Sequence, residues 1–546
     1  MTRSVLLALL LGVVLGAGLW VWQGRGPALT ASPTGALPTH ETPLRVVSGA
    51  GPGAFADDAP FLAEVLLSTG VHGMSVGPPG GEVVVFPEAA CPEVAHAPPG
   101  ARRLVLGLCP EILQGQVPPP DLSGSPDVPL TGLPGAAEGI TPGPPRTDTG
   151  LPLPAVLNTW SSAVIAESPF EPLLRAGDHV VAIRMDDLIV VSFDLVGWLR
   201  LRRQGSPTLA DVDTDGLHGP KPNDLAPYTG ELEDWRRAGG DRWALWLRDQ
   251  LGPDWPVAPT LPAGAPTVLV LTFDQDFAEP QWIDPLLARV EGAGGTATLL
   301  RTDTTRQRNG AEVDAVGRAL PPEDLRRWAR AGHGLGMHPH VVGLVPRTWA
   351  PGSEGPDPRE TGLRLQAERL VAEGRPALAA RHHFLHWWGY ATPLDLQAEL
   401  GVWVDLTFVG MAPQFALPGF GFGGALPMRF QREDGSFVPV LVQPTVLEDD
   451  VLMSDYPYSH GMTLDGVLAA LPTVFDEVEA VGAPLVVNIH PTLEIKREAR
   501  FLDALLAEAQ TRGAPIWSAE RWAAFTWERL NGQLAPEETG AAVSSP

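Results

Sequence analysis

Residues 268–277 read VLVLTFDQDF, an apolar run that ends abruptly in two acidic residues, Asp274 and Asp276. Turn-forming residues between Pro262 and Pro266 precede the run, so it predicts a buried strand that opens a domain. Because burying an unpaired charge is costly, carboxylates at the end of such a strand indicate a metal ion, a catalytic proton or an ion pair. Acidic residues in this place also cap helices, and the stretch alone favours neither interpretation.

The second half of the chain alternates between strand-like and helix-like segments. Repeated strand–helix units predict a parallel sheet, and about seven of them predict closure into a distorted (β/α)7 barrel, here over residues 263–532. Barrel enzymes build their active sites at the carboxyl-terminal ends of the strands, so polar residues at those ends should gather at one rim. The polar residues so placed are Asp274 and Asp276, His338 and His340, Arg381 and His383, and His490. Two histidines and a carboxylate are a common ligand set for Zn²⁺ or a similar divalent ion.

The first half, residues 44–262, shows a weaker alternation, which we interpret as a doubly wound α/β domain with Pro- and Gly-rich loops over residues 98–154. Two apolar runs flank residues 184–187 and predict a β-hairpin. Cys91 and Cys109 are the only cysteines. Export would permit a disulfide between them, and two small buried apolar side chains are the alternative.

The two ends of the chain differ from its interior. An uncharged apolar run over residues 5–22 predicts that residues 1–24 are an uncleaved signal anchor or a cleaved signal peptide, and residues 25–43 are interpreted as a flexible tether. We therefore expect a protein anchored in the inner membrane with its bulk in the periplasm or extracytoplasmic space, or secreted if the leader is removed. Residues 533–546 are expected to be a disordered tail.

Composition limits the partners. The chain has 546 residues, enough for two to four domains of about 150 residues each, and a formal net charge of −26. Phosphate contacts need clustered basic side chains, so this balance excludes nucleic acid or an anionic lipid surface as the main partner. It places no restriction on a neutral sugar substrate, and it does not predict an oligomeric state.

Residues 266–530 resemble the polysaccharide deacetylases, a carbohydrate esterase family 4-like group of distorted β/α barrels. Four motifs carry the resemblance: Thr-Phe-Asp-Gln-Asp at 272–276, Gly-His-Gly-Leu-Gly-Met-His-Pro-His at 332–340, Arg-His-His-Phe-Leu-His-Trp-Trp-Gly-Tyr at 381–390, and an apolar strand ending in a histidine at 485–490. The chain departs from the family's pattern at Gln275, where the second aspartate is usual, and at Val342, where the second histidine is usual.

The resemblance implies roles for the residues at the rim. Asp274 would be the general base that activates water, Arg381 would orient it, and His490 would be the general acid. A divalent metal, expected to be Zn²⁺, would be held by Asp276 and His338, with His340 or His383 in place of the residue that the chain lacks. Trp388 and Tyr390 could form the floor of a sugar groove, and core packing is the alternative for such aromatic residues.

Residues 44–262 resemble, more weakly, a class I glutamine-amidotransferase-like domain. An active domain of that kind needs a nucleophilic cysteine in a glycine-flanked turn, with a histidine and a glutamate two residues apart. Cys109 is followed by a proline and no His-x-Glu follows at the expected place. We therefore expect this half to be non-catalytic.

Three functions remain open from the sequence. The first is a membrane-tethered, metal-dependent hydrolase that removes N-acetyl groups from a cell-envelope or extracellular polysaccharide. The second is a catalytically inactive glycan-binding or scaffold protein that keeps the barrel. The third is an amidotransferase-like enzyme that uses Cys109.

Overall fold

The computed structural model of the chain contains two large β-sheets and the helices that cover them. The described residues are 44–47, 58–107 except 73, 109, 160–213, 219–225 and 239–531, the last with gaps at 253–254, 256, 303, 309–310, 317–319, 341–356, 373–376, 410–423 and 457–458. The predictions for the leader, the tether, the tail and most of the Pro- and Gly-rich loops lie outside these residues. In the part that is described, no helix is long and apolar enough to cross a membrane.

The first sheet has the strand order β2-β1-β3-β4-β8-β7-β5, and β6 also pairs with β7. Its strands are β1 (Leu44–Val47), β2 (Met74–Gly77), β3 (Val83–Pro87), β4 (Arg102–Leu106), β5 (Trp160–Ser161), β6 (Glu171–Ala176), β7 (His179–Met185) and β8 (Leu188–Val191). Strands β1, β2, β3, β4 and β8 run parallel, and β7 is antiparallel to its neighbours. The antiparallel β7–β8 pair confirms the predicted hairpin.

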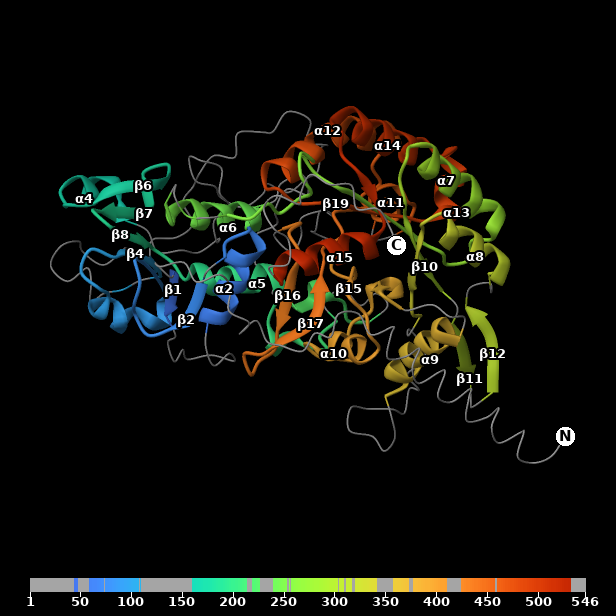
Figure 1. The fold of residues 1–546 in the computed structure, drawn as a ribbon, viewed down its shortest axis with the longest axis horizontal. Helices are drawn as coiled ribbons and strands as arrows, with labels where there is room; N and C mark the ends of the chain where they lie inside the picture. The colour runs from blue at the N-terminus through green and yellow to red at the C-terminus, as the bar shows by residue number, and fades with distance from the viewer. Residues whose placement is uncertain are drawn as a thin grey trace.

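Alternate side chains of the first sheet enter two separate cores. Helices α2 (Ala59–Ser68), α5 (Leu195–Gln204) and α6 (Gly239–Gln250) pack on one face, and η1 (Glu88–His96) and α4 (Ser162–Ala166) pack on the other. This division follows from strand geometry, because successive side chains point to opposite faces. Figure 1 shows α2, α5 and α6 between the first sheet and the rest of the molecule.

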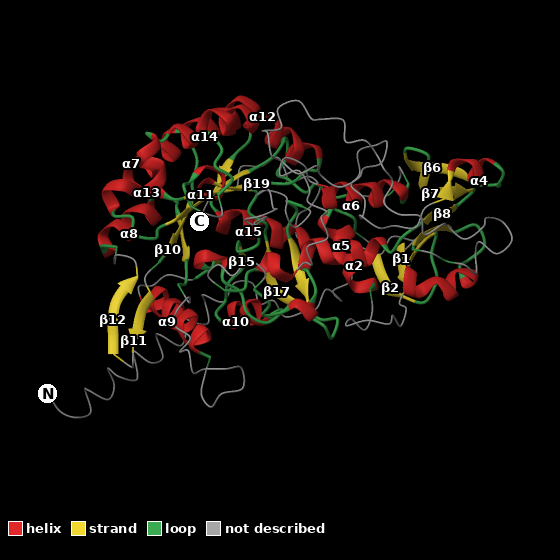
Figure 2. Cartoon of the chain, turned by 180° about the vertical axis from the view of Figure 1, so that it is seen from behind, coloured by secondary structure: helices red, strands yellow, loops and turns green. Residues whose placement is uncertain are grey.

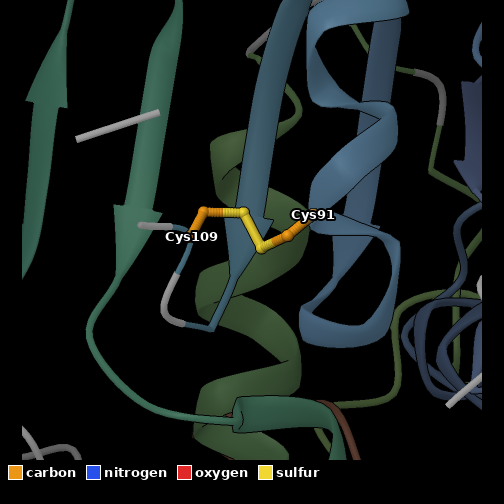
Figure 3. Close-up of a disulfide and its surroundings, with 2 residues drawn as sticks. All are labelled: Cys91 and Cys109. Carbon is orange, nitrogen blue, oxygen red and sulfur yellow. A yellow bond between two sulfur atoms is a disulfide. The ribbon is translucent and has the colours of Figure 1, made fainter. Parts of the chain in front are cut away.

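Cys91 of η1 and Cys109, which lies just beyond β4, form a disulfide across 18 residues of sequence, with their Cα atoms 5.4 Å apart. Figure 3 shows this bond joining the short helix to the end of the strand. Both cysteines are buried in the core on that face. A cysteine held in a disulfide cannot act as a nucleophile, so the third function, an amidotransferase-like enzyme using Cys109, is wrong for this structure.

The second sheet has the order β16-β17-β15-β14-β13-β10-β9-β19-β18, and β20 also pairs with β9. Its strands are β9 (Leu269–Asp274), β10 (Thr298–Arg301), β13 (Gly334–Met337), β14 (Ala379–Ala380), β15 (Val404–Asp405), β16 (Met428–Gln431), β17 (Phe437–Val442), β18 (Leu447–Glu448), β19 (Leu485–Ile489) and β20 (Ile516–Trp517). All neighbours are parallel except β16 and β17. A separate hairpin joins β11 (Thr304–Arg308) to β12 (Ala311–Val316).

Helices cover the outer face of the second sheet, as Figures 1 and 2 show. They are α7 (Pro280–Gly292), α8 (Pro322–Arg330), α9 (Pro358–Ala372), α10 (Thr392–Glu399), α12 (Leu464–Ala480) and α14 (Arg500–Arg512), with short α11 (Asp449–Met453) and α13 (Pro491–Glu494) after β18 and β19. Alternate residues of the strands point inward and form one core with α15 (Ala519–Leu530). The sequence therefore predicted the parallel, helix-covered sheet correctly.

The predicted closure into a complete barrel is not observed in the described strands, because no pairing among them joins β18 to β16. Two side chains from helices on the first sheet, Glu64 of α2 and Gln204 of α5, bond to the free edge of β16 instead. The backbone N–H of Arg429 donates to Glu64 (2.9 Å), and its carbonyl accepts a hydrogen bond from Gln204 (3.2 Å). An exposed strand edge presents unpaired polar groups, and these contacts satisfy those of Arg429 without a further strand.

Asp241 of α6 makes a second set of bonds in this contact. Its carboxylate pairs with the buried guanidinium of Arg203 (2.6 Å) and accepts hydrogen bonds from the backbone N–H groups of Ala425 (2.6 Å) and Leu426 (3.0 Å). The side chain is fully buried. It therefore joins a helix on the first sheet to the segment that leads into β16.

We expect Asp241→Ala to lower the free energy of unfolding by about 3–5 kcal/mol, because it leaves the buried Arg203 guanidinium without its counter-charge. Asp249→Ala is the control, since Asp249 is 62% exposed and pairs with Arg248 at the surface. Its effect should stay below about 1 kcal/mol. Urea unfolding followed by circular dichroism measures both, and equal effects would contradict the role given to Asp241.

Candidate active site and metal centre

The site lies at the carboxyl-terminal ends of the strands of the second sheet, on its inward-facing side. Val270 and Ala379 belong to the inward-facing core. Side chains alternate along a strand, so Asp274, four residues after Val270, and Arg381, two residues after Ala379, point to the same side. His490 follows β19 in the same way. The strand pattern thus explains why residues more than 200 positions apart meet.

Arg381 is completely buried, and each of its three guanidinium nitrogens donates at least one hydrogen bond. It donates to Asp274 Oδ1 (3.0 Å), Thr272 Oγ1 (2.9 Å), Thr445 Oγ1 (2.7 Å) and the carbonyl of Leu406 (3.1 Å). A planar group with fixed donors holds its partners in one geometry. The structure therefore places Arg381 where it orients Asp274.

Asp274 is held as an ionised carboxylate. Asn488 donates to its second oxygen, Oδ2 (2.8 Å). Burial alone would raise the pKa of Asp274, but the charge of Arg381, helped by the rings of His338 and His490, outweighs it and holds the pKa below its usual range. A carboxylate with both oxygens directed in this way can accept a proton from water placed beside it.

Asp276, His338 and His383 form a group that can hold a metal ion, with one ligand atom of each within 4.8 Å of the others. Asp276 Oδ1 lies 3.4 Å from His338 Nε2 and 3.3 Å from His383 Nε2. Asp276 Oδ1 and His338 Nε2 are buried and have no hydrogen-bond partner within the described residues. Buried polar atoms are rarely left unpaired, so these two indicate a ligand between them. A carboxylate and two imidazoles fit Zn²⁺.

The protonation of the two histidine rings suits that role. His338 Nδ1 donates to the carbonyl of Arg381 (2.8 Å), which leaves Nε2 with its lone pair toward Asp276. Burial would lower the pKa of His338, but the carboxylates of Asp274 and Asp276 outweigh it and raise the pKa. The same two negative charges would favour a metal cation at Nε2 in place of the proton. Burial lowers the pKa of His383 to about 3, which keeps that ring neutral.

His340 lies beside the group rather than in it. Its Nδ1 makes a hydrogen bond of 2.5 Å with Nδ1 of His383. If His383 offers Nε2 to a metal, its proton is on Nδ1 and His340 is the acceptor. Of the two histidines that the sequence left open, the structure places His383 in the group and turns Nδ1 of His340 to His383, where it can support that ligand.

The turn after β9 explains why Asp276 takes the position expected for the residue before it. The side chain of Gln275 accepts from the N–H of Thr302 (3.3 Å) and donates to the carbonyl of Ala278 (3.4 Å). Asp276 adopts a left-handed backbone conformation (φ 45°), which costs a non-glycine residue about 1 kcal/mol. Its N–H is held by Thr302 Oγ1 (3.1 Å). Gln275 is therefore a structural residue that presents Asp276 to the site.

His490 is paired with acidic groups that the sequence analysis did not identify. Its Nδ1 lies 2.7 Å from Asp449 Oδ1, and Arg497 donates to Asp449 Oδ2 (2.7 Å). Burial would lower the pKa of His490, but the charges of Asp450 and Asp449 outweigh it and raise the pKa well above its usual value. The signal in the sequence was the acidic run Glu-Asp-Asp at 448–450, directly after a strand.

Trp388 and Tyr390 do not form a sugar-binding surface. Their exposed fractions are 2% and 6%, and both belong to the apolar core that includes residues of α9 and α10. The indole of Trp388 stacks on the ring of His382. The guanidinium of Arg359 also lies over the indole, with its Cζ atom 5.3 Å from the ring centroid. The expected substrate-binding role is corrected to core packing, the alternative that the sequence left open.

No protein-family model and no curated protein matches the chain. Among solved structures, similar ones include a peptidoglycan deacetylase from Bacillus subtilis (12% identity, 49% of this chain and 95% of that chain, TM-score 0.27) and a family 4 carbohydrate esterase from Streptomyces lividans (12%, 46% and 93%, 0.26). A family 4 esterase from Streptococcus mutans is another (15%, 46% and 85%, 0.27). At these values the matches carry no argument about function, and they give no support to an amidotransferase-like first half.

We expect the purified chain to bind one Zn²⁺ near neutral pH and Asp276→Ala or His383→Ala to abolish that binding, because each removes one of three ligands. His340→Ala should weaken it by about 10–100-fold, since it removes only the acceptor that orients His383. Isothermal titration calorimetry gives the affinities. His96→Ala is the control, as that ring is 70% exposed on η1. Equal affinities for the Asp276→Ala and His96→Ala proteins would contradict the site.

Proposed function

We propose that the chain is an exported, membrane-tethered hydrolase that removes N-acetyl groups from a cell-envelope or extracellular polysaccharide. The observation that carries the proposal is an acid and a base on either side of one metal-ligand group. Asp274 Oδ2 lies 3.7 Å from His338 Nε2, and His490 Nε2 lies 3.7 Å from Asp276 Oδ2. The base is ionised and the acid is protonated, and such a separation of pKa values assigns the two roles.

The residues supply each proton transfer of amide hydrolysis. Asp274 accepts a proton from water as the water oxygen bonds to the acyl carbon. His490 donates its Nε2 proton to the nitrogen of the leaving amine as the carbon–nitrogen bond breaks, which gives acetate and a free amino sugar. A divalent ion held by Asp276, His338 and His383 would polarise the carbonyl and acidify the water. Arg381 and Asp449 keep the base and the acid in place.

Export is supported by the disulfide, because such bonds persist in oxidising compartments. The membrane tether rests on the apolar run at residues 5–22, which lies outside the described residues. A neutral glycan suits a chain with a net charge of −26 better than an anionic polymer does. Phe277, 58% exposed and next to Asp276, is the aromatic side chain that we assign to contact a sugar ring in place of Trp388.

Asp274→Asn should lower kcat for acetate release from N-acetylated oligosaccharides by about 10²–10⁴-fold, because the amide cannot accept the proton of water. An enzymatic acetate assay on chitin and peptidoglycan fragments measures the rate, and Asp249→Asn at the exposed surface is the control. A parent protein that binds zinc and glycan but releases no acetate would instead establish the inactive glycan-binding alternative.

Asp449→Asn should move the alkaline limb of the kcat profile to lower pH by about 1–3 units. The charge of Asp449 helps to hold His490 protonated. Removing that charge lowers the pKa of His490, so less of the acid form is present as the pH rises. Initial rates across the pH range measure the shift, and an unchanged limb would show that His490 is not the general acid.

A further inference from the structure

Glu448 is a further carboxyl group in the site, and the side-chain amide of Asn488 links it to Asp274. It is the last residue of β18 and is the register partner of Asn488 in β19. The Nδ2 atom of Asn488 donates both to Asp274 Oδ2 (2.8 Å) and to Glu448 Oε1 (2.8 Å). Thr272 Oγ1 lies 3.3 Å from Asn488 Oδ1, which fixes the orientation of the amide. Asn488 therefore holds the two carboxyl groups at a set separation.

The second oxygen of Glu448, Oε2, makes no bond of this kind. It is buried in a residue that is only 5% exposed, and it has no hydrogen-bond partner among the described residues. Glu448 offers an oxygen within 4.8 Å of both an oxygen of Asp274 and a ring nitrogen of His490. Since Oε1 is taken by Asn488, Oε2 is the atom available to a ligand between the base and the acid.

The charges around Glu448 favour its neutral form. Arg381 pairs with Asp274, and Arg497 pairs with Asp449. In the described part of the chain, no ion pair joins Glu448 to a cation. A buried carboxylate without a partner is costly, so it keeps its proton instead. In agreement, burial together with the negative charge of Asp450 raises the pKa of Glu448 to about 8, against the opposing charges of Arg381 and His490.

We propose that Glu448 stands in the site as a neutral carboxylic acid whose Oε2–H donates a hydrogen bond to the acyl oxygen of the substrate, which makes it a further catalytic residue between Asp274 and His490. The inference rests on the proposed function, and the group that Glu448 would bind is an uncharged carbonyl of the substrate. The acyl oxygen gains negative charge when water adds to the carbon, so a donor fixed in advance stabilises the transition state more than the ground state. The proton stays on Glu448 throughout, and no bond of Glu448 is broken.

The test compares two substitutions of similar size. Glu448→Gln keeps an acceptor for Asn488 and an N–H donor in the place of Oε2–H, so kcat on an N-acetylated oligosaccharide should stay within about threefold of the parent. Glu448→Leu removes the donor and should lower kcat by about 10²–10³-fold with little change in KM. If Glu448→Gln loses as much as Glu448→Leu, Glu448 acts as a carboxylate and the proposal is wrong. If Glu448→Leu is as active as the parent, it has no catalytic role.

A second measurement needs no substrate. Infrared difference spectra of the parent and Glu448→Gln proteins near neutral pH should show the loss of one protonated-carboxyl C=O band. The absence of that band in the parent would overturn the neutral form even if the enzyme is active, so failure of this inference is distinguishable from failure of the proposed function. Zinc content is measured alongside: one ion per chain in both proteins is expected, and a fall from two to one would make Glu448 a ligand of a second cation.

Discussion

The buried guanidinium of Arg381 is the interaction on which the site depends. It lies on the inward-facing side of the second sheet and donates hydrogen bonds to three segments of the chain. The acceptors are Asp274 of β9, the carbonyl of Leu406 just after β15, and Thr445 shortly before β18. A buried charge of this kind is tolerated only when its donors are satisfied, so the strands must hold their acceptors in place for the fold to keep it. Its bond to Asp274 fixes that carboxylate, and the backbone carbonyl of the same residue accepts a hydrogen bond from the ring of His338. Removing the guanidinium would therefore disturb Asp274 and leave the carbonyl that holds His338.

Helices on the first sheet contact the open edge of the second sheet. Glu64 and Gln204 bond to the edge of β16, and Asp241 bonds to the segment before it. These contacts lie on the side of the second sheet where its strands do not close. Cys109 is held in a disulfide, which excludes it as a nucleophile, and the absence of catalysis in the first half stays a prediction. The domain thus covers an edge that a closed barrel would not have.

The sequence predicted much of the site because strand ends are a local feature. Asp274, His338, Arg381 and His490 each follow an apolar run, and parallel packing brings such ends to one rim. The choice between His340 and His383 could not be predicted, because it depends on how two loops fold against each other. Asn488 and Glu448 were missed for a similar reason: their importance comes from one shared amide, which no spacing in the sequence reveals. Trp388 was misassigned because an indole beside a Gly-Tyr turn carries no local sign of burial.

The central claim is that Asp276, His338 and His383 hold one divalent ion between the base and the acid. Crystals of the chain grown with zinc, with an anomalous difference map collected at the zinc edge, test it most directly. The account predicts one strong peak bounded by Asp276 Oδ1, His338 Nε2 and His383 Nε2, at about 2.0–2.2 Å from each. A peak at another set of residues, or no peak at saturating zinc, would contradict it.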